Sequence, residues 1–203
     1  MARRLLWPVA VGGGTHAGAI TVAERLVAQG AQALVSFGLA GGLVPELRPG
    51  ELLVPHMVYA GGECFPTDPH VSQLLGGISP HTLYGAEAAV VTSEAKRDAH
   101  ARTAAAAVDL ESGAVARVAM AHRLPFAVLR AVCDSAERDL PPAALVALDS
   151  QGGISILRVL HSVIAEPRQL PALIKLAADA GLARRALTAR VMQIARTAPQ
   201  RRR

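Results

Sequence analysis

The sequence predicts an α/β protein in which helices cover both faces of a mostly parallel central sheet, as a three-layer sandwich. Apolar runs of strand length alternate with runs of helical periodicity along the chain, which is typical of this class. The clearest strand, residues 126–132, is apolar except at Arg130 and is therefore expected to be buried on both faces. Carboxylates stand where such elements begin or end, and these ends line the ligand crevice of α/β sheets.

Composition narrows the class of protein further. The chain of 203 residues can bury a substantial core, and because 51% of its residues are hydrophobic but only 3% aromatic, that core must consist of Ala, Val and Leu. Two cysteines without a CxxC spacing favour a reducing compartment, so we expect a cytoplasmic protein. The histidines show no metal-ligand spacing, so neither a metal nor another cofactor is expected.

Charge is unevenly distributed. The net charge is +5, arginines crowd residues 184–203, and no acid follows Asp179. A solvated end is the simpler interpretation, and peripheral contact with anionic lipid is the alternative. No nucleic-acid partner is expected, and no uncharged apolar run is long enough to span a bilayer.

In chain order, residues 7–11 are predicted to form the first strand, and Gly12, Gly13 and Gly14 a tight turn into the first helix. A helix N-terminus behind a glycine turn can bind an anion through backbone N–H groups, so this loop is a candidate anion or ribose-side site. A plain strand-to-helix turn is an equal alternative. A dinucleotide site does not fit, because Gly12, Gly14 and Gly18 miss the GxGxxG spacing.

A second strand, residues 33–37, ends in a segment of small residues that includes Gly38, Ala40 and Gly41. Side chains this small let a ligand approach the backbone closely, so the segment is a candidate binding site, with a flexible turn as the alternative. Residues 51–59 are predicted as a further strand.

Residues 61–80 are rich in Gly, Pro, Ser and Asp and are predicted to form a long loop or flap. A strand at residues 84–91 and a helix beginning near Lys96 are expected next. Beyond the long apolar strand, residues 158–165 and 170–180 are predicted as amphipathic helices.

The most informative stretch is residues 108–136. Asp109 and Glu111 stand directly before an Ala- and Val-rich helical run, and Asp134 stands directly after the apolar strand. A charge at the exit of a buried strand is poorly placed for simple solvation, which makes Asp134 a candidate site residue.

The motifs of this stretch resemble those of the superfamily of purine nucleoside phosphorylases and methylthioadenosine/S-adenosylhomocysteine nucleosidases. Residues 109–112 and 129–136, DLES and LRAVCDSA, are similar to its (V)DME(S/A/G) and VxRx(I/V)SDx(A) patterns. Residues 36–43 and 49–54, SFGLAGGL and PGELLV, are similar to two upstream motifs of the same superfamily, in the same order.

Two departures from these motifs are visible, namely Leu110 for the usual Met and Cys133 for the usual Ser. The resemblance extends over about residues 9–147. It implies a nucleoside phosphorylase-like domain at residues 1–165, followed by C-terminal helices and a basic tail at residues 166–203.

The resemblance implies cleavage of the N-glycosidic bond of a purine nucleoside. Asp134 would protonate N7 of the leaving base, Glu111 would accept the ribose hydroxyls, and Arg130 would face the ribose and the nucleophile. A helix cap or a core ion pair is the structural alternative for the two carboxylates. Further substrate contacts are expected from small and apolar residues around the site: Leu110, Gly38, Ala40 and Gly41.

Phosphate is the expected co-substrate, although Ser36 and Leu39 replace the Arg and the Ser or Thr that phosphorylases of the family often carry. Residues 138–144 and 167–173 resemble the hopanoid-associated phosphorylases, which implies phosphorolytic release of adenine from lipid-linked adenosylhopane. The alternatives are a methylthioadenosine/S-adenosylhomocysteine-type nucleosidase and a catalytically impaired nucleoside-binding protein.

Aligned by these motifs, residues 7–14 match the third strand of the family, so we expect the family's N-terminal segment to be missing. A sheet without that segment would expose an edge, and oligomerisation would cover it. We therefore expect a homo-oligomer. Because the residues that would hold phosphate or activate water are not evident, we also expect the chain to turn over adenine nucleosides poorly or not at all.

Overall fold

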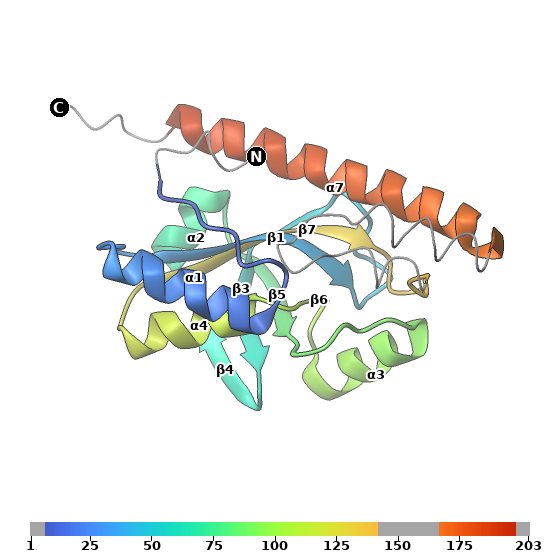
Figure 1. The fold of residues 1–203 in the computed structure, drawn as a ribbon, viewed down its shortest axis with the longest axis horizontal. Helices are drawn as coiled ribbons and strands as arrows, with labels where there is room; N and C mark the ends of the chain where they lie inside the picture. The colour runs from blue at the N-terminus through green and yellow to red at the C-terminus, as the bar shows by residue number, and fades with distance from the viewer. Residues whose placement is uncertain (1–6, 142–166, 198–203) are drawn as a thin grey trace.

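The computed structural model describes residues 7–141 and 167–197 and is built around a seven-stranded sheet (Figure 1). The strand order is β2-β7-β1-β6-β5-β3-β4. The strands are β1 (Leu34–Gly42), β2 (Leu52–Leu53), β3 (Pro55–Ala60), β4 (Glu63–Pro66), β5 (Ser79–Gly85), β6 (Ala107–Asp109) and β7 (Phe126–Asp134). The helices are α1 (His16–Ala28), α2 (Pro69–Leu75), α3 (Ser93–Thr103), α4 (Ser112–Ala121), the short 3-10 helix η2 (Pro167–Gln169) and α7 (Leu170–Thr197).

The sheet consists of two parallel groups. Strand β1 pairs with β7 in parallel along its length, and β6, β5 and β3 pair in parallel with one another. The groups meet where Gly41 and Gly42 of β1 pair with Val108 and Ala107 of β6 in antiparallel register. The outer strands β2 and β4 are also antiparallel to their neighbours. The predicted α/β class is confirmed, with a sheet that is mixed at its edges and at this junction.

Helices cover both faces of the sheet. Figure 1 shows α1 and α4 side by side on one face and α7 running across the other, on the same side as α2. The core beneath α1 and α4 contains Ala19, Ala114 and Val128, whereas the core beneath α7 contains Leu129, Ala183 and Leu187. Strand β7 contributes to both cores, and this explains why its sequence is apolar at almost every position.

Local sequence signals explain where the helices begin. The Thr15 side chain caps α1 by accepting a hydrogen bond from Gly18 N at 3.1 Å, directly after the predicted glycine turn. Asp68 caps α2 in the same way, with Pro69 at the first helical position, and Thr92 caps α3.

Three element predictions are wrong. The strand predicted at residues 84–91 lies earlier, as β5 at residues 79–85, and residues 86–91 form no strand. Residues 7–11 form no strand, and Pro8, which lacks a backbone N–H, interrupts the run. Residues 61–80 are not one long loop, because they contain β4, α2 and the start of β5. Their Gly and Pro residues serve a tight hairpin at Gly61 and Gly62 and a helix start at Pro69.

The C-terminal part described by the structure consists of the short η2 and one long helix. The predicted helix at residues 170–180 continues to Thr197, so that α7 has 28 residues. None of the helices within residues 7–141 and 167–197 is both long and apolar enough to cross a membrane. The helix predicted at residues 158–165 lies outside the described residues, and the domain boundary at residue 165 stays a prediction.

Candidate active site

A cluster of buried charges and hydroxyl groups surrounds Arg130 on β7. Its guanidinium is 2% exposed and forms an ion pair with Asp109, the last residue of β6. Arg130 Nη2 also donates to Ser36 Oγ at 2.6 Å and to Ser112 Oγ at 3.1 Å. Ser112 Oγ in turn donates to Asp109 Oδ2 at 2.6 Å. A buried guanidinium needs such partners, because an uncompensated charge in the core is very costly.

Glu111 connects this cluster to the glycine turn before α1. It precedes the first turn of α4, and its carboxylate lies 3.6 Å from Arg130 Nη1 through Oε2. Its other oxygen, Oε1, accepts a hydrogen bond from Gly14 N at 3.0 Å. A Cβ atom at Gly12 would lie 2.8 Å from the same oxygen, so the absence of a side chain lets the turn approach. The structure thus brings the predicted loop, Glu111 and Arg130 together, and Gly13 takes a positive φ of 73° within that loop.

Asp134 at the end of β7 has a different environment. It is 4% exposed, and its Oδ2 forms an ion pair with the ammonium of Lys96 from α3. Its Oδ1 accepts a hydrogen bond from Cys133 Sγ at 3.2 Å. Burial, and then the charge of Asp134, raise the pKa of the Cys133 thiol well above its usual range, so the thiol keeps its proton and remains a donor.

Lys96 was not predicted as a site residue. Helix α3 is polar, and of its eleven residues only Lys96 and Ala99 are buried. The available signal was weak, because a lysine that shares a helical stripe with one alanine is indistinguishable from an exposed one by periodicity. The structure reveals its role through its partners, Asp134 and the carbonyl oxygens of Ser135 and Arg138.

The glycines of β1 lie against both charged groups. A Cβ atom at Gly38 would overlap Arg130 Nη1, and one at Gly41 would lie 3.3 Å from each carboxylate oxygen of Asp134. Gly38 and Gly41 are about 10 Å apart along an extended strand, a separation that one nucleoside can bridge. The β1 segment therefore joins the Arg130 cluster to the Asp134 pair on one strand.

The remaining predicted residues take supporting positions. Ala40 is 3% exposed and belongs to the core beneath α1 and α4. Leu110 is partly buried and packs, together with Tyr84, against a small core near α3 that contains Leu43 and Val108. An apolar wall of this kind lies next to the strand ends that carry Asp109 and Asp134.

A cavity of about 490 Å³ lies beside the Arg130 cluster. Its lining includes Ser36, Gly12 and Glu111, and most of the other lining residues are apolar. The cavity follows β1 from Leu34 to Phe37, where β1 has no second strand partner among the described residues. Asp134 is not part of its lining, so the cavity adjoins the Glu111 side of the site.

Substitution of Gly38 by Ala is expected to displace the Arg130 guanidinium, because the added Cβ would occupy its position. We expect a loss of about 1–3 kcal/mol in the free energy of unfolding from this overpacking, measured by urea denaturation. Gly181→Ala is the matched control, since a Cβ there in α7 meets only Arg185 Nη1 at 3.9 Å. The control should stabilise the protein by about 0.5–1 kcal/mol; equal effects of both variants would contradict the close approach at Gly38.

Comparison with known proteins gives one family. The model of the phosphorylase superfamily matches residues 8–164. A comparison with curated protein sequences gives no significant match.

Solved structures show the same fold at low sequence identity. A methylthioadenosine/S-adenosylhomocysteine nucleosidase from Colwellia psychrerythraea, solved with adenine, is 19% identical with a TM-score of 0.59; the match covers 74% of this chain and 76% of that one. Futalosine hydrolase of Helicobacter pylori is 18% identical with a TM-score of 0.59, over 88% of this chain and 76% of that one. A mutant of that hydrolase is 19% identical with a TM-score of 0.54; the match covers 58% of this chain and 66% of that one.

Proposed function

Since the chain belongs to the phosphorylase superfamily, we propose that it cleaves the N-glycosidic bond of an adenine nucleoside. One observation carries this proposal. Strand β7 places Arg130 and Asp134 beside Gly38 and Gly41 of β1, while Glu111 lies between Arg130 and the glycine turn before α1. Such an arrangement supplies separate polar groups for the two ends of a nucleoside.

In the proposed reaction the C1′–N9 bond breaks and its electron pair passes to the purine. N7 of the purine takes a proton from the Asp134 side, and an oxygen of the nucleophile bonds to C1′. The proton that the nucleophile loses replaces the one given to N7. General acid assistance of this kind typically contributes about 10²–10⁴-fold to the rate.

Glu111 is proposed to orient the ribose by accepting its hydroxyl groups. Its side chain is 21% exposed, in contrast to the buried Asp109 that neutralises Arg130. One carboxylate is thus committed to the core ion pair, whereas the other remains accessible to a ligand. Orientation of the sugar relative to the nucleophile lowers the entropic part of the barrier.

Adenosylhopane is the proposed substrate, with phosphate as the co-substrate and no other cofactor. The resemblance to hopanoid-associated phosphorylases motivates this choice, and the largely apolar cavity beside Glu111 supports a nucleoside with an apolar 5′ substituent. Helix α7 carries exposed Leu170, Ile174 and Leu182, followed by exposed Arg184 and Arg185. This pattern supports a cytoplasmic protein that touches a membrane surface, and a homo-oligomer is part of the same proposal.

Hydrolysis is the second candidate, and a specific observation favours it. Asp109, Ser36 and Ser112 all contact Nη2 of Arg130, and Nε, which has no hydrogen-bond partner among the described residues, is buried. An incoming phosphate would therefore have to bind Nη1, which lies 3.6 Å from Glu111, and displace that carboxylate. Two of the similar solved structures are also described as a nucleosidase and a hydrolase. Water needs no such anion site, so the two reactions make different demands on this cluster.

Adenine formation, followed by chromatography with and without phosphate, is expected to test the function. Adenosine, methylthioadenosine and a 5′-alkylthio analogue with a long chain serve as substrates. We expect adenine release that depends on phosphate and is fastest with the long alkyl chain. Release that is independent of phosphate would establish hydrolysis instead, and equal rates for all three substrates would contradict a lipid-linked substrate.

Glu111→Gln is expected to raise KM and to lower kcat together, because the ribose contact exists in both the ground state and the transition state. The variant should fold normally, since this side chain is partly exposed. Glu24→Gln is the matched control, because Glu24 is an exposed acid on α1. Unchanged steady-state kinetics in Glu111→Gln would remove Glu111 from the ribose site.

A further inference from the structure

We infer that Lys96 is a positioning residue that keeps Asp134 ionised in the unliganded protein and thereby selects a 6-aminopurine over a 6-oxopurine. The inference rests on the proposed function, because it takes Asp134 as the residue beside the base. It adds a determinant of base specificity that lies on α3, outside the motifs that define the site.

The contacts of Lys96 show that its ammonium is fully used within the protein. The side chain is 0% exposed, and Nζ donates to Asp134 Oδ2, to Ser135 O at 2.8 Å and to Arg138 O at 2.9 Å. An ammonium has three N–H donors and no acceptor, so these three partners satisfy it. Lys96 has no donor left for a ligand and acts on one only through Asp134.

The pairing fixes the charge of Asp134. Two of the three partners of Lys96 are neutral carbonyl groups, so the Asp134 carboxylate is its counterion within the cluster. Protonation of that carboxylate would leave a buried positive charge without compensation, which is strongly unfavourable. Cys133 adds a donor on Oδ1, so each carboxylate oxygen of Asp134 accepts a hydrogen bond, a pattern that suits the acceptor-only ionised form.

An ionised carboxylate distinguishes the two kinds of purine. Adenine presents an N–H donor on its 6-amino group next to N7, and a carboxylate can accept from it. Hypoxanthine presents the acceptor O6 next to the acceptor N7, so an ionised Asp134 would face two lone pairs without a proton between them. The unfavourable contact with the wrong base supplies the specificity.

The proton for N7 then comes from Lys96 by way of Asp134. Nζ of Lys96 passes one proton to the carboxylate as Asp134 passes one to N7, which leaves a neutral amine and a carboxylate. The proton lost by the nucleophile later restores the ammonium, so the cycle balances without another reactant. The existing contact between Nζ and Oδ2 provides the path for this transfer.

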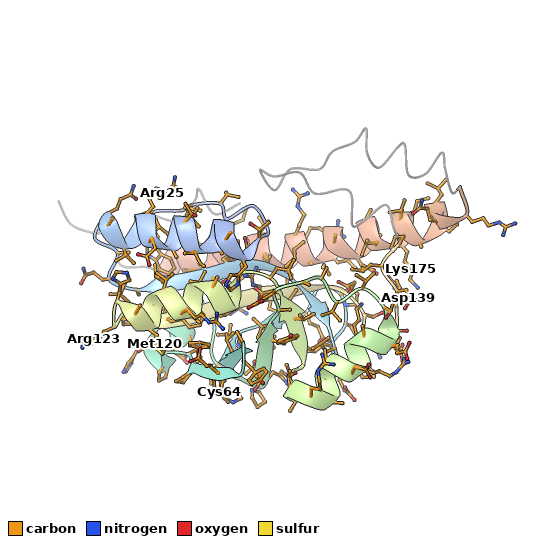
Figure 2. All side chains as sticks on the ribbon, turned by 60° about the horizontal axis from the view of Figure 1, so that its bottom comes forward. Arg25, Cys64, Met120, Arg123, Asp139 and Lys175 are labelled. Atoms are coloured by element: carbon orange, nitrogen blue, oxygen red, sulfur yellow. The ribbon has the colours of Figure 1, made fainter. Side chains whose placement is uncertain are left out.

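The test compares kcat/KM for adenosine and inosine in the full chain. We expect the wild type to prefer adenosine by at least about 10²-fold, the discrimination that a hydrogen-bonding site achieves. Lys96→Met, which removes the charge at similar length, should reduce this preference to within about 10-fold, because a neutral Asp134 can donate to either purine. Lys175→Met is the matched control, since Lys175 is an exposed lysine on α7, and its preference should equal that of the wild type (Figure 2).

A second variant covers the case in which Lys96→Met fails to fold. Lys96→Met/Asp134→Asn removes both charges and avoids an unpaired ion in the core. The side-chain amide introduced by Asp134→Asn can donate to N7 and O6, so we expect a preference for inosine. Binding of adenine and hypoxanthine, measured by calorimetry, should show the same order as the kinetics.

If a folded Lys96→Met variant lost kcat/KM equally for adenosine and inosine, the inference would be overturned and Lys96 would be a structural residue only. A preference for adenosine that persists in the double variant would overturn it as well. If the wild type neither cleaved a nucleoside nor bound adenine, the proposed function would fail first, and the inference with it. A wild type that prefers adenine, with variants that keep that preference, would refute the role of Lys96 alone.

Discussion

Replacement of Asp134 by Asn is expected to lower kcat for adenine release by about 10²–10⁴-fold, with little change in KM. The substitution keeps the size of the side chain but removes the carboxylate that passes a proton to N7. It also leaves the buried ammonium of Lys96 without its counterion, so the free energy of unfolding should fall as well. Because this proton is needed mainly in the transition state, binding of the nucleoside should change less than turnover. Steady-state kinetics with adenosine, normalised to the folded fraction, would measure the effect.

The control for this variant is Asp139→Asn. Asp139 is exposed and accepts a hydrogen bond from Ser93 N at the start of α3, which lowers the pKa of its carboxyl group (Figure 2). An amide oxygen can accept the same bond, so this variant should keep its kcat. If Asp134→Asn also kept its kcat, Asp134 would have no part in the chemistry.

Arg130→Met is expected to lower the free energy of unfolding by about 3–5 kcal/mol, the usual cost of removing one partner of a buried ion pair. The loss arises because Asp109 would remain in the core without its cation, and because Ser36 and Ser112 would each lose a donor. Urea denaturation followed by circular dichroism would measure the change. Activity should disappear as well, since the guanidinium also lies beside Glu111.

Two further variants isolate this effect. Arg25→Met changes an exposed arginine in the last turn of α1 and should stay within about 0.5 kcal/mol of the wild type (Figure 2). Arg130→Met/Asp109→Asn removes both charges and should recover a large part of the stability lost in the single variant. A single variant as stable as the wild type would show that the ion pair contributes nothing to the fold.

Much of the fold was predictable because burial leaves a clear pattern of apolar residues in a few segments. Strand β7 is apolar at nearly every position since it faces a core on each side, and the Ala- and Val-rich run of α4 follows the helical period. The short-range signal of Gly, Pro and Asp at residues 61–80 was ambiguous, because the same residues serve loops, hairpins and helix caps. The sequence therefore indicated turns and helix starts in this region without indicating which strands and helices lie between them.

The site was predictable in part for the same reason. Asp134 and Glu111 stand at element ends, and the motifs around them suggested their roles, which stay predictions. Lys96 could not be predicted, because its burial depends on the packing of α3 against the end of β7 and not on any local pattern. The extra residue in β7 could not be predicted either. Cys133 has no partner in the register with β1, where Ala40 pairs with Val132 and Gly41 with Asp134.

The three contacts of Lys96 also have a consequence for local opening of the molecule. Its ammonium joins α3 to the end of β7 and to the carbonyl of Arg138, whose guanidinium is paired with Asp179 on α7. Any fluctuation that lifts α3 from the sheet would separate two buried ions at once, at a cost of several kcal/mol. The amides around Asp134 should therefore exchange their hydrogens with solvent as slowly as those of the central strands, although this residue lies where the strand gives way to a loop.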